Sequence, residues 1–598
     1  RRQRQMCIRD RDMLTKGLKL TAMYAFDVYN EIHVHQDRAE STYNFLDTSV
    51  PYDMNGQPIL QRIYEGSNVL SYTQETSGNK KTYLEASLNY DRTFNDDHRV
   101  SALFLFNQQS KLLYPKGTLE DAIPYRMMGI AGRATYSWKD RYFAEFNIGY
   151  NGAENFSPKH RFGTFPAFGV GWVVSNEKFW QPLSKAVSFL KIRYTDGKVG
   201  NSEVSDRRFM YLDQMKENGD YGYKFGPNGT KWSGYETVNM AVDLIWEESR
   251  KQDLGIDLKL FNDDLSIVFD LFKERRENIL LKREHSIPSF LGYNTSAPYG
   301  NIGIIENKGF DGTIEYNKRI NKDWVIALRG NVTFNKDKWI QGELPEQKYE
   351  WMNQYGHNIN GVKGYVAEGL FTQAEIDDMA RWESLSDANK AITPKPFASQ
   401  FGTVKAGDIK YKDLNNDGQI DAYDQTYISR GDVPTTVYGF GFTVGWKDLS
   451  VGMMFQGVAG AERVLNGSSV NPFNGGGGSG NLYSNIGDRW TEENPDQNAF
   501  YPRLSYGSET TSNINNFQKS TWWVRNMNFL RLKTLQISYN LPKPWVNKVH
   551  LKNAAVYVMG TNLFTLSRFK LWDPELNTDN GASYPNTTSY SVGINFTF

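Results

Sequence analysis

The segment from Asp413 to Asp424 has the residue types and the spacing of a loop that binds a divalent cation. Oxygen donors occupy its positions 1, 3, 5 and 12, a glycine occupies position 6 and an apolar residue occupies position 8. This spacing wraps a chain around Ca²⁺, because the glycine makes the sharp turn and the backbone carbonyl at position 7 adds a further donor. The predicted ligands are Asp413, Asn415, Asp417, Gln419 through its carbonyl, and Asp424, while Asp421 could bind through water.

Two alternatives to a calcium site stay open at this point. The aspartate at position 12, Asp424, reaches less far than a glutamate, so the affinity for Ca²⁺ would be lower than in sensor loops or the ion would be Mg²⁺. The same residues could instead form an Asx-rich turn whose side chains bind only the amides of the loop itself. The spacing favours a structural Ca²⁺ over these alternatives.

The other reactive side chains do not indicate catalysis. Cys7 is the only cysteine, so disulfides within the chain are excluded. His33 and His35 share one strand face, but a zinc site needs further ligands that the sequence does not place. No nucleophile–base pair or phosphate-binding loop stands out. Basic and acidic residues number 68 each, which provides no net field for nucleic acid. We therefore predict neither an enzyme nor a nucleic-acid-binding protein.

The elements that carry these loops are strands with one apolar and one polar face. Side chains alternate between the two faces of a strand, and the last nine residues are large and apolar at every even position, up to Phe598. No run approaches the ~18 apolar residues of a membrane-spanning helix, whereas strands of a membrane barrel need only alternate apolar residues. Ribbons of this kind cover residues 16–31, 80–94, 98–112, 126–138, 142–150, 165–175, 188–198, 254–260, 264–283, 307–320, 323–336, 437–446, 448–460, 526–541, 551–562 and 590–598.

Short and long connections alternate along the chain. Short polar turns are expected at 94–98, 138–141, 261–264, 319–323 and 446–449. Long connections cover about 200–250, 284–306, 337–432 and 461–525, the last with a glycine-rich segment at 474–480. This sorting is typical of outer-membrane barrels. The fold class predicted is all-β: a large antiparallel transmembrane β-barrel of about 16–18 strands, with long extracellular loops and short periplasmic turns.

Three local predictions concern the loops and the N-terminus. A short helix is expected at 372–383, because Thr372 can cap it. Trp232, Trp351, Trp522 and Trp523 could stack on sugars or peptides, or anchor the barrel at the lipid interface; the position of the last two, just before a strand, favours anchoring. Residues 1–12 are charged and without a period, so they stay unassigned and are expected to be foreign to the fold, whereas 13–598 are assigned to a partial barrel domain.

Several segments, taken in order, resemble SusC/RagA-type TonB-dependent outer-membrane transporters. The similarity extends from about residue 15 to 598. It rests on the blocks at 190–201 (LKIRYTDGKVGN), 246–258, 302–310, 369–371, 407–424, 434–440 and 529–542, and on the terminal Phe598.

The resemblance implies a plugged barrel of 22 strands in the outer membrane of a Gram-negative, Bacteroidetes-type bacterium. It further implies an N-terminal plug with a TonB box, a SusD-like surface lipoprotein partner, and import of oligosaccharides or peptides driven through the TonB complex. The chain shows no plug and no TonB box and has too few strands, so we expect a C-terminal barrel fragment of such an importer.

Two other functions stay open from the residues alone. A passive outer-membrane pore or a surface adhesin barrel would use the same wall of strands. A soluble carbohydrate-binding β-protein would also be rich in aromatic residues and glycine. The sequence assigns no residue to substrate, and it does not distinguish a glycan from a peptide.

Overall fold

The computed structural model describes residues 4–9, 15–46, 49–114, 122–203, 207–227, 229, 231–288, 290, 297–467, 470, 472, 483–505 and 514–598. The glycine-rich segment at 474–480 and half of residues 1–12 lie outside this set. The chain divides into two compact units, which are described separately. The first comprises 1–136, 145–166 and 202–246, and the second comprises 137–144, 167–201 and 247–598.

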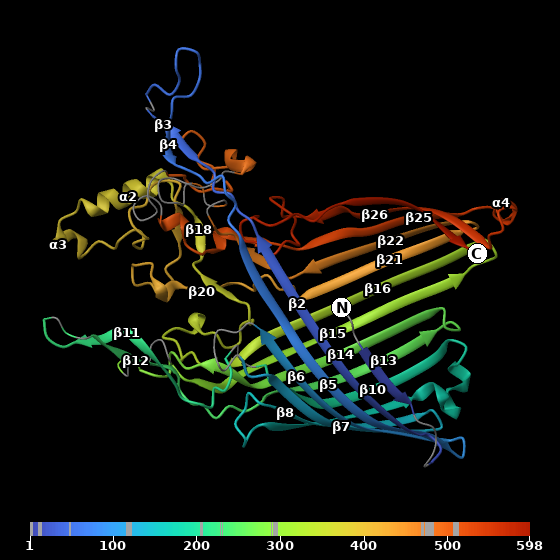
Figure 1. Cartoon of the computed structure of the whole chain (residues 1–598). Helices are drawn as coiled ribbons and strands as arrows, with labels where there is room; N and C mark the ends of the chain where they lie inside the picture. Colours follow the sequence, from blue (N-terminus) through green and yellow to red (C-terminus); the bar gives the residue numbers. More distant parts are fainter. Residues whose placement is uncertain are drawn as a thin grey trace. The chain divides into compact units, whose positions relative to one another are not determined.

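The second unit is built on an antiparallel ladder in which strands adjacent in the sheet follow one another along the chain (Figure 1). Short polar turns on one side favour this meander, since each strand returns beside its predecessor. The strands are β10 (Val187–Asn201), β13 (Glu247–Leu260), β14 (Leu265–Lys282), β15 (Tyr299–Arg319), β16 (Trp324–Gln341), β21 (Thr436–Trp446), β22 (Leu449–Ala459), β25 (Phe529–Asn540), β26 (Asn553–Ser567) and β27 (Ser589–Thr597).

The first unit contains a second antiparallel ladder in which β1 pairs with β2, β2 with β5, and β5 with β6. Among the described residues the main sheet has 17 strands, within the predicted range of 16–18. Strand β1 was not expected, because its residues have no apolar period; its backbone nevertheless pairs with β2. The bounds are β1 (Arg4–Arg9), β2 (Leu18–His35), β5 (Thr73–Phe94), β6 (His98–Tyr114), β7 (Tyr125–Trp138), β8 (Tyr142–Ala153) and β9 (Phe162–Val173), the last three having residues in both units.

The short turns have the backbone that tight hairpins need. Asn95 and Asp96 have φ of 49° and 57°, and Lys139 and Asp140 have 53° and 51°. Left-handed conformations at successive turn residues match the right-handed twist of the flanking strands, and asparagine and aspartate tolerate them well. The predicted connections at 94–98 and 138–141 are therefore confirmed as hairpin turns.

The apolar face of the strands is turned outward rather than into a core. On β21, Phe440 and Trp446 are exposed, and Phe440 stacks on Phe455 of β22 with ring centroids 4.9 Å apart. The opposite face of β21 carries Gly439 and Gly441. A protein in water buries its large aromatic residues, whereas an outer-membrane strand presents them to lipid. The predicted alternation of apolar and polar residues is confirmed, and the apolar face of the strands lies on the outer surface.

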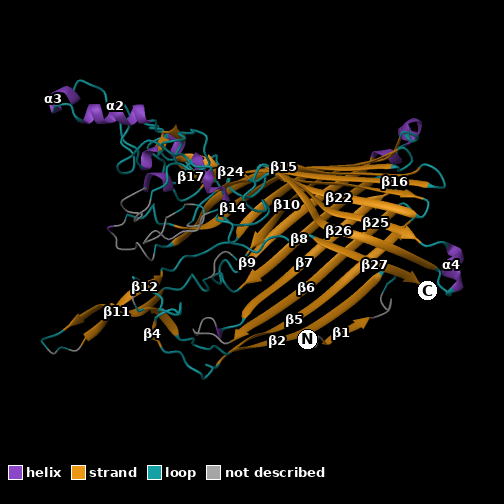
Figure 2. Ribbon diagram, turned by 90° about the horizontal axis from the view of Figure 1, so that it is seen from above, coloured by secondary structure: helices purple, strands orange, loops and turns teal. Residues whose placement is uncertain are grey.

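Within the second unit, the long connections gather at one end of the strands and the short turns at the other (Figure 2). The loop end contains short strand pairs and two helices, while α4 (Lys543–Lys548) lies at the turn end. This confirms the predicted sorting of loops. The loop elements are β17 (Val362–Gly364), β18 (Ala367–Leu370), β19 (Ile409–Tyr411), β20 (Thr426–Ser429), β23 (Glu462–Val464), β24 (Val524–Asn526), α2 (Gln373–Glu383) and α3 (Asp387–Lys390).

The short strands inside the long connections were not predicted, because three or four residues are too few to show a period. Two further hairpins lie in the first unit: β3 (Thr42–Phe45) with β4 (Leu60–Tyr64), and β11 (Gln214–Lys224) with β12 (Lys231–Asn239). Short 3₁₀ helices are η1 (Val174–Asn176), η2 (Lys178–Leu183), η4 (Glu350–Met352), η5 (Ala422–Asp424), η6 (Ser484–Gly487), η7 (Ile514–Phe517) and η8 (Thr521–Trp523).

Helix α2 begins where the sequence predicts. The Thr372 hydroxyl accepts from the Glu375 amide at 3.3 Å, and the Glu375 carboxylate accepts from the Thr372 amide at 2.9 Å. This reciprocal capping box satisfies two backbone donors that the helix leaves open. Among the described residues, no helix has both the length and the apolar content to cross a bilayer.

Candidate functional site

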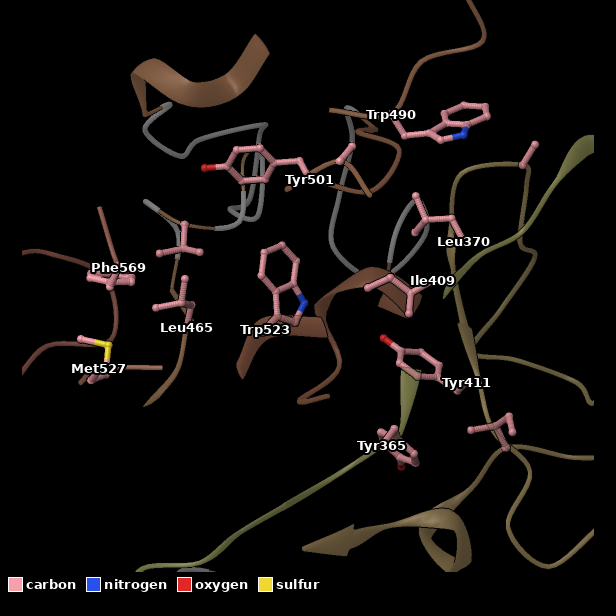
Figure 3. Close-up of a cluster of buried hydrophobic side chains, with 14 of the residues drawn as sticks. Tyr365, Leu370, Ile409, Tyr411, Leu465, Trp490, Tyr501, Trp523, Met527 and Phe569 are labelled. Atoms are coloured by element: carbon pink, nitrogen blue, oxygen red, sulfur yellow. The ribbon is translucent and has the colours of Figure 1, made fainter. Parts of the chain in front are cut away.

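The long loops of the second unit form a hydrophobic core of their own. Trp523, Tyr501 and Ile409 are each exposed by 2% or less. The first two come from the connection between β22 and β25, and Ile409 comes from the connection between β16 and β21. Figure 3 shows Trp523 among the other side chains of this loop cluster. The cluster comprises Tyr365, Leu370, Ala406, Ile409, Tyr411, Ile420, Ala461, Leu465, Val470, Trp490, Ala499, Tyr501, Trp523, Met527 and Phe569. Loops tied together by such a core have a fixed shape and can present a defined surface.

A buried ion pair joins two of these loops. Both Asp408 oxygens accept from the Arg503 guanidinium at 2.9 Å, and the Asn516 amide donates to the same carboxylate at 2.9 Å. The Lys405 backbone amide adds a fourth bond at 2.8 Å. A charge this deeply buried is tolerated only when it is paired and hydrogen-bonded, as Asp408 is.

Two tyrosines of the loop cluster are held in their neutral form. The Tyr411 hydroxyl donates to the Asn515 carbonyl at 2.7 Å, and burial raises the pKa of Tyr411 far above its usual range. Burial likewise raises the pKa of Tyr501 to about 12. Both hydroxyls therefore stay uncharged at neutral pH inside the cluster.

The interface-anchor interpretation of Trp522 and Trp523 is wrong. The Trp523 indole donates to the Asn516 carbonyl at 2.9 Å inside the cluster, and Trp522 packs against it and donates to the Phe500 carbonyl at 3.2 Å. The loops fold over these side chains, which a reading of the local sequence cannot reveal. Trp351 stacks on Tyr349 with centroids 4.5 Å apart, and the side chain of Trp232 lies outside the described residues.

The predicted metal loop follows the expected backbone path. Gly418, at position 6, has φ of 83°, and Asn416 has φ of 58°. The two oxygens of Asp413 accept from the amides of Asn416 and Gly418, at 2.6 and 2.8 Å. Asp424, fully buried at position 12, accepts from the Leu414 amide at 2.8 Å and thereby closes the loop.

The other predicted ligands also face amides of the loop. Asn415 accepts from the Asp417 amide at 3.0 Å, and Asp417 accepts from the Gln419 amide at 3.0 Å. No cluster of three or more His, Cys, Asp or Glu side chains placed to hold a metal occurs in the described part of the chain. Ile420, at position 8, is buried in the loop cluster, and its amide donates to Ser399. In this structure the side-chain oxygens of the loop accept from amides of the loop itself, and Ile420 ties the loop to the cluster.

The polar face of the strands carries a charge network that sequence reasoning missed. Arg193 of β10 forms ion pairs with Asp253 and Asp257 of β13, at 3.3 and 3.4 Å, and with Asp270 of β14 at 2.6 Å. A β carbon on Gly255 would overlap both the Arg193 guanidinium and the Asp270 carboxylate. The signal in the sequence was an aspartate at alternate positions around a glycine, which only the strand register connects to Arg193.

The two histidines do not form a metal centre with described residues. The His33 and His35 rings lie 6.3 Å apart on β2, and the imidazole of His33 lies 3.1 Å from Glu31. Both side chains are exposed.

No protein-family profile matches the chain. TonB-dependent receptor P26 of Formosa agariphila is 25% identical over 584 residues, which cover 90% of this chain and 55% of that protein. TonB-dependent receptor SusC of Bacteroides thetaiotaomicron is 23% identical over 483 residues, covering 78% and 43%. The solved RagAB peptide transporter superposes with a TM-score of 0.71 at 19% identity, covering 98% of this chain and 60% of that chain. The resemblance to SusC/RagA-type TonB-dependent transporters is confirmed.

The likeness to RagAB, at 19% identity, shows the fold, which is the predicted antiparallel β-barrel. The chain spans about half the length of the curated relatives it matches. These SusC/RagA-type relatives are named receptors and transporters, not enzymes, which agrees with the prediction that the chain is no enzyme.

Proposed function

We propose that the chain is the barrel wall and loop end of an outer-membrane importer that takes up oligosaccharides or peptides and is energised through TonB. The observation that carries this proposal is that the strands expose aromatic residues on their outer face while the long loops share one hydrophobic core. The aromatic face suits lipid, and the cluster suits selective recognition outside the cell. The relatives named TonB-dependent receptors support the energy source.

The partners follow from the same resemblance. A SusD-like lipoprotein would cover the loop end, and the TonB complex would act through the importer's plug. The name of the RagAB peptide transporter supports a peptide substrate, whereas the SusC relative leaves oligosaccharides open. A passive pore or adhesin barrel is less well supported, because the relatives are named for TonB dependence.

The proposal is tested in the native organism. Deletion of the gene should abolish growth on one class of oligomer, either oligosaccharide or peptide, and leave growth on the matching monomer unchanged. Removal of TonB should reproduce the defect. Uptake that survives the loss of TonB would indicate a passive pore, and fractionation of the protein away from the outer membrane would refute the proposed location.

We also propose that the loop Asp413–Asp424 binds a structural Ca²⁺, with Mg²⁺ as the alternative ion. The ligands would be Asp413, Asn415, Asp417, the Gln419 carbonyl and Asp424. The positive φ of Gly418 supports the fit, because the loop must turn sharply at position 6 to wrap around an ion. The buried Asp424 supports it too, because its oxygens accept from the Leu414 and Asp421 amides and so close the loop. The ion would stiffen the loop cluster that presents the outer surface.

Calorimetric titration of the purified protein with Ca²⁺ tests this second proposal. At a concentration 100 times the Kd, binding should stabilise the cluster by about 2.7 kcal/mol. The variant Asp417→Ala should lose the heat of binding. If EDTA leaves the protease sensitivity of residues 337–432 unchanged, the loop is only an Asx-rich turn.

A further inference from the structure

The first unit contains a recess of about 710 Å³ on the polar face of its strands. Strand β6 supplies Gln109 and Lys111, both at odd positions, and β7 adds Tyr125 and Arg126 at its first residues. The exposed Phe104 of β6 stands at an even position and therefore on the other face of that strand. The recess thus opens away from the lipid side. Its size lies within the range of small-ligand sites.

Arg208 lies at the base of the recess, and its guanidinium is held in place by several contacts. The Arg208 side chain is 4% exposed and forms an ion pair with Glu154. Its guanidinium also donates to the carbonyls of Ile123 and Pro124 and lies 4.0 Å from the centre of the Tyr125 ring. Because Glu154 is engaged by Arg208, it adds no free negative charge to the recess.

The wall of the recess carries an excess of positive charge. Its charged lining consists of Lys111, Arg126 and Arg208 against Glu154 and Glu203. Lys111 lies directly opposite Lys81 of β5 in the ladder, and both are half-buried. In the portion of the chain with described coordinates, neither lysine forms an ion pair. Like charges opposite each other destabilise a sheet unless an anion lies between them.

A carboxylate lies in the same row of the ladder as this lysine pair. Asp27 of β2 is opposite Lys81 on the far side from Lys111. It offsets at most one of the two positive charges. The row across the three strands therefore keeps a positive charge at Lys111, the lysine that lines the recess.

We infer that this recess binds the carboxylate group of an imported oligomer, with Lys111 as the primary contact. The inference rests on the proposed function and deepens it, since it assigns anionic substrates to the importer. A carboxylate is the anionic group that both proposed substrate classes can carry, as an acidic or C-terminal group in peptides and as a uronic acid in glycans. A lysine ammonium and the Gln109 amide donate the hydrogen bonds that such a group accepts.

The test is direct binding to the detergent-solubilised protein. The probes are tetragalacturonic acid and the peptide Ala-Glu-Ala-Glu, each compared with a neutral counterpart, maltotetraose and Ala-Gln-Ala-Gln amide. We expect at least one acidic probe to bind more tightly than its counterpart, and the variant Lys111→Gln to weaken it about tenfold or more, as the loss of a charge-assisted hydrogen bond does. Raised salt should weaken the same probe.

The matched control is Lys19→Gln. Lys19 stands on the same face of β2 as Asp27, eight positions and roughly 26 Å along the strand. The Lys19→Gln variant should bind the acidic probe as tightly as the unchanged protein does. Equal effects of the two variants would indicate a general charge effect, and equal binding of acidic and neutral probes, or no binding of any probe, would overturn the inference. If the inference fails in one of these ways but the organism still shows TonB-dependent growth on a neutral oligomer, the proposed function stands.

Discussion

At the scale of single residues, positive backbone angles and close packing coincide at a few glycines. Gly407 has φ of 84°, and a β carbon there would overlap the indole of Trp490 in the loop cluster. Gly356 has a similar φ of 92°, but a β carbon would meet nothing within 4 Å. The two positions therefore separate backbone strain from steric overlap.

The substitution Gly407→Ala should destabilise the loop cluster by roughly 2–5 kcal/mol, because the left-handed strain and the overpacking add. The matched variant Gly356→Ala should cost only about 1–2 kcal/mol of strain. Thermal unfolding followed by tryptophan fluorescence measures both. Equal losses would mean that Trp490 moves aside without cost.

A second prediction at residue scale concerns His357, which stacks on Tyr427 with ring centroids 4.1 Å apart. Burial lowers the pKa of His357, and the nearby Lys363 ammonium lowers it further. The folded loop thus prefers the neutral imidazole. Its stability should be constant above the ordinary histidine pKa of about 6.5 and should fall as the pH drops below it.

Limited proteolysis of the loop 337–432 between pH 7.5 and 5.5 measures this effect. Cleavage should accelerate at the lower pH, and the variant His357→Gln should remove most of the pH dependence. The same acceleration in the variant would assign the effect to other groups.

At the scale of elements, the ion pair of Asp408 and Arg503 ties the segment after α2 to a distant loop. Replacing Arg503 by Met would leave a buried carboxylate without its partner, which costs about 3–5 kcal/mol. The double variant Asp408→Asn with Arg503→Met should recover part of that loss. Chemical denaturation of the three proteins gives the coupling free energy, and additive losses would mean that the pair contributes no specific stability.

At the scale of the whole molecule, the two faces of each strand meet different surroundings. Phe440 and Thr443 lie on opposite faces of β21. The variant Phe440→Arg should destabilise the barrel by about 2–4 kcal/mol if that position lies near the middle of the bilayer, whereas Thr443→Arg should be tolerated. Folding into lipid vesicles, followed by the mobility of unheated samples on gels, compares them. Equal tolerance would contradict the assignment of the lipid face.

The sequence alone predicted much of the framework. Alternation located the long strands, the polar turns located the hairpins, and Thr372 with Glu375 located helix α2. These features are local: a strand shows its period within ten residues, and a cap acts across one turn. The residue spacing also singled out the loop Asp413–Asp424, in which Gly418 makes a left-handed turn and whose ion stays a proposal.

Only the tertiary structure decided which distant residues meet. The burial of Trp523, the bond from Arg503 to Asp408 and the juxtaposition of Lys81 with Lys111 each depend on contacts between separate connections or on strand register. A shift of one residue in register would turn a side chain to the opposite face. Thus the alternation of apolar and polar residues along the sequence determined a lipid-facing wall of strands. The loop core and the charged recess were determined by long-range packing, which no local pattern encodes.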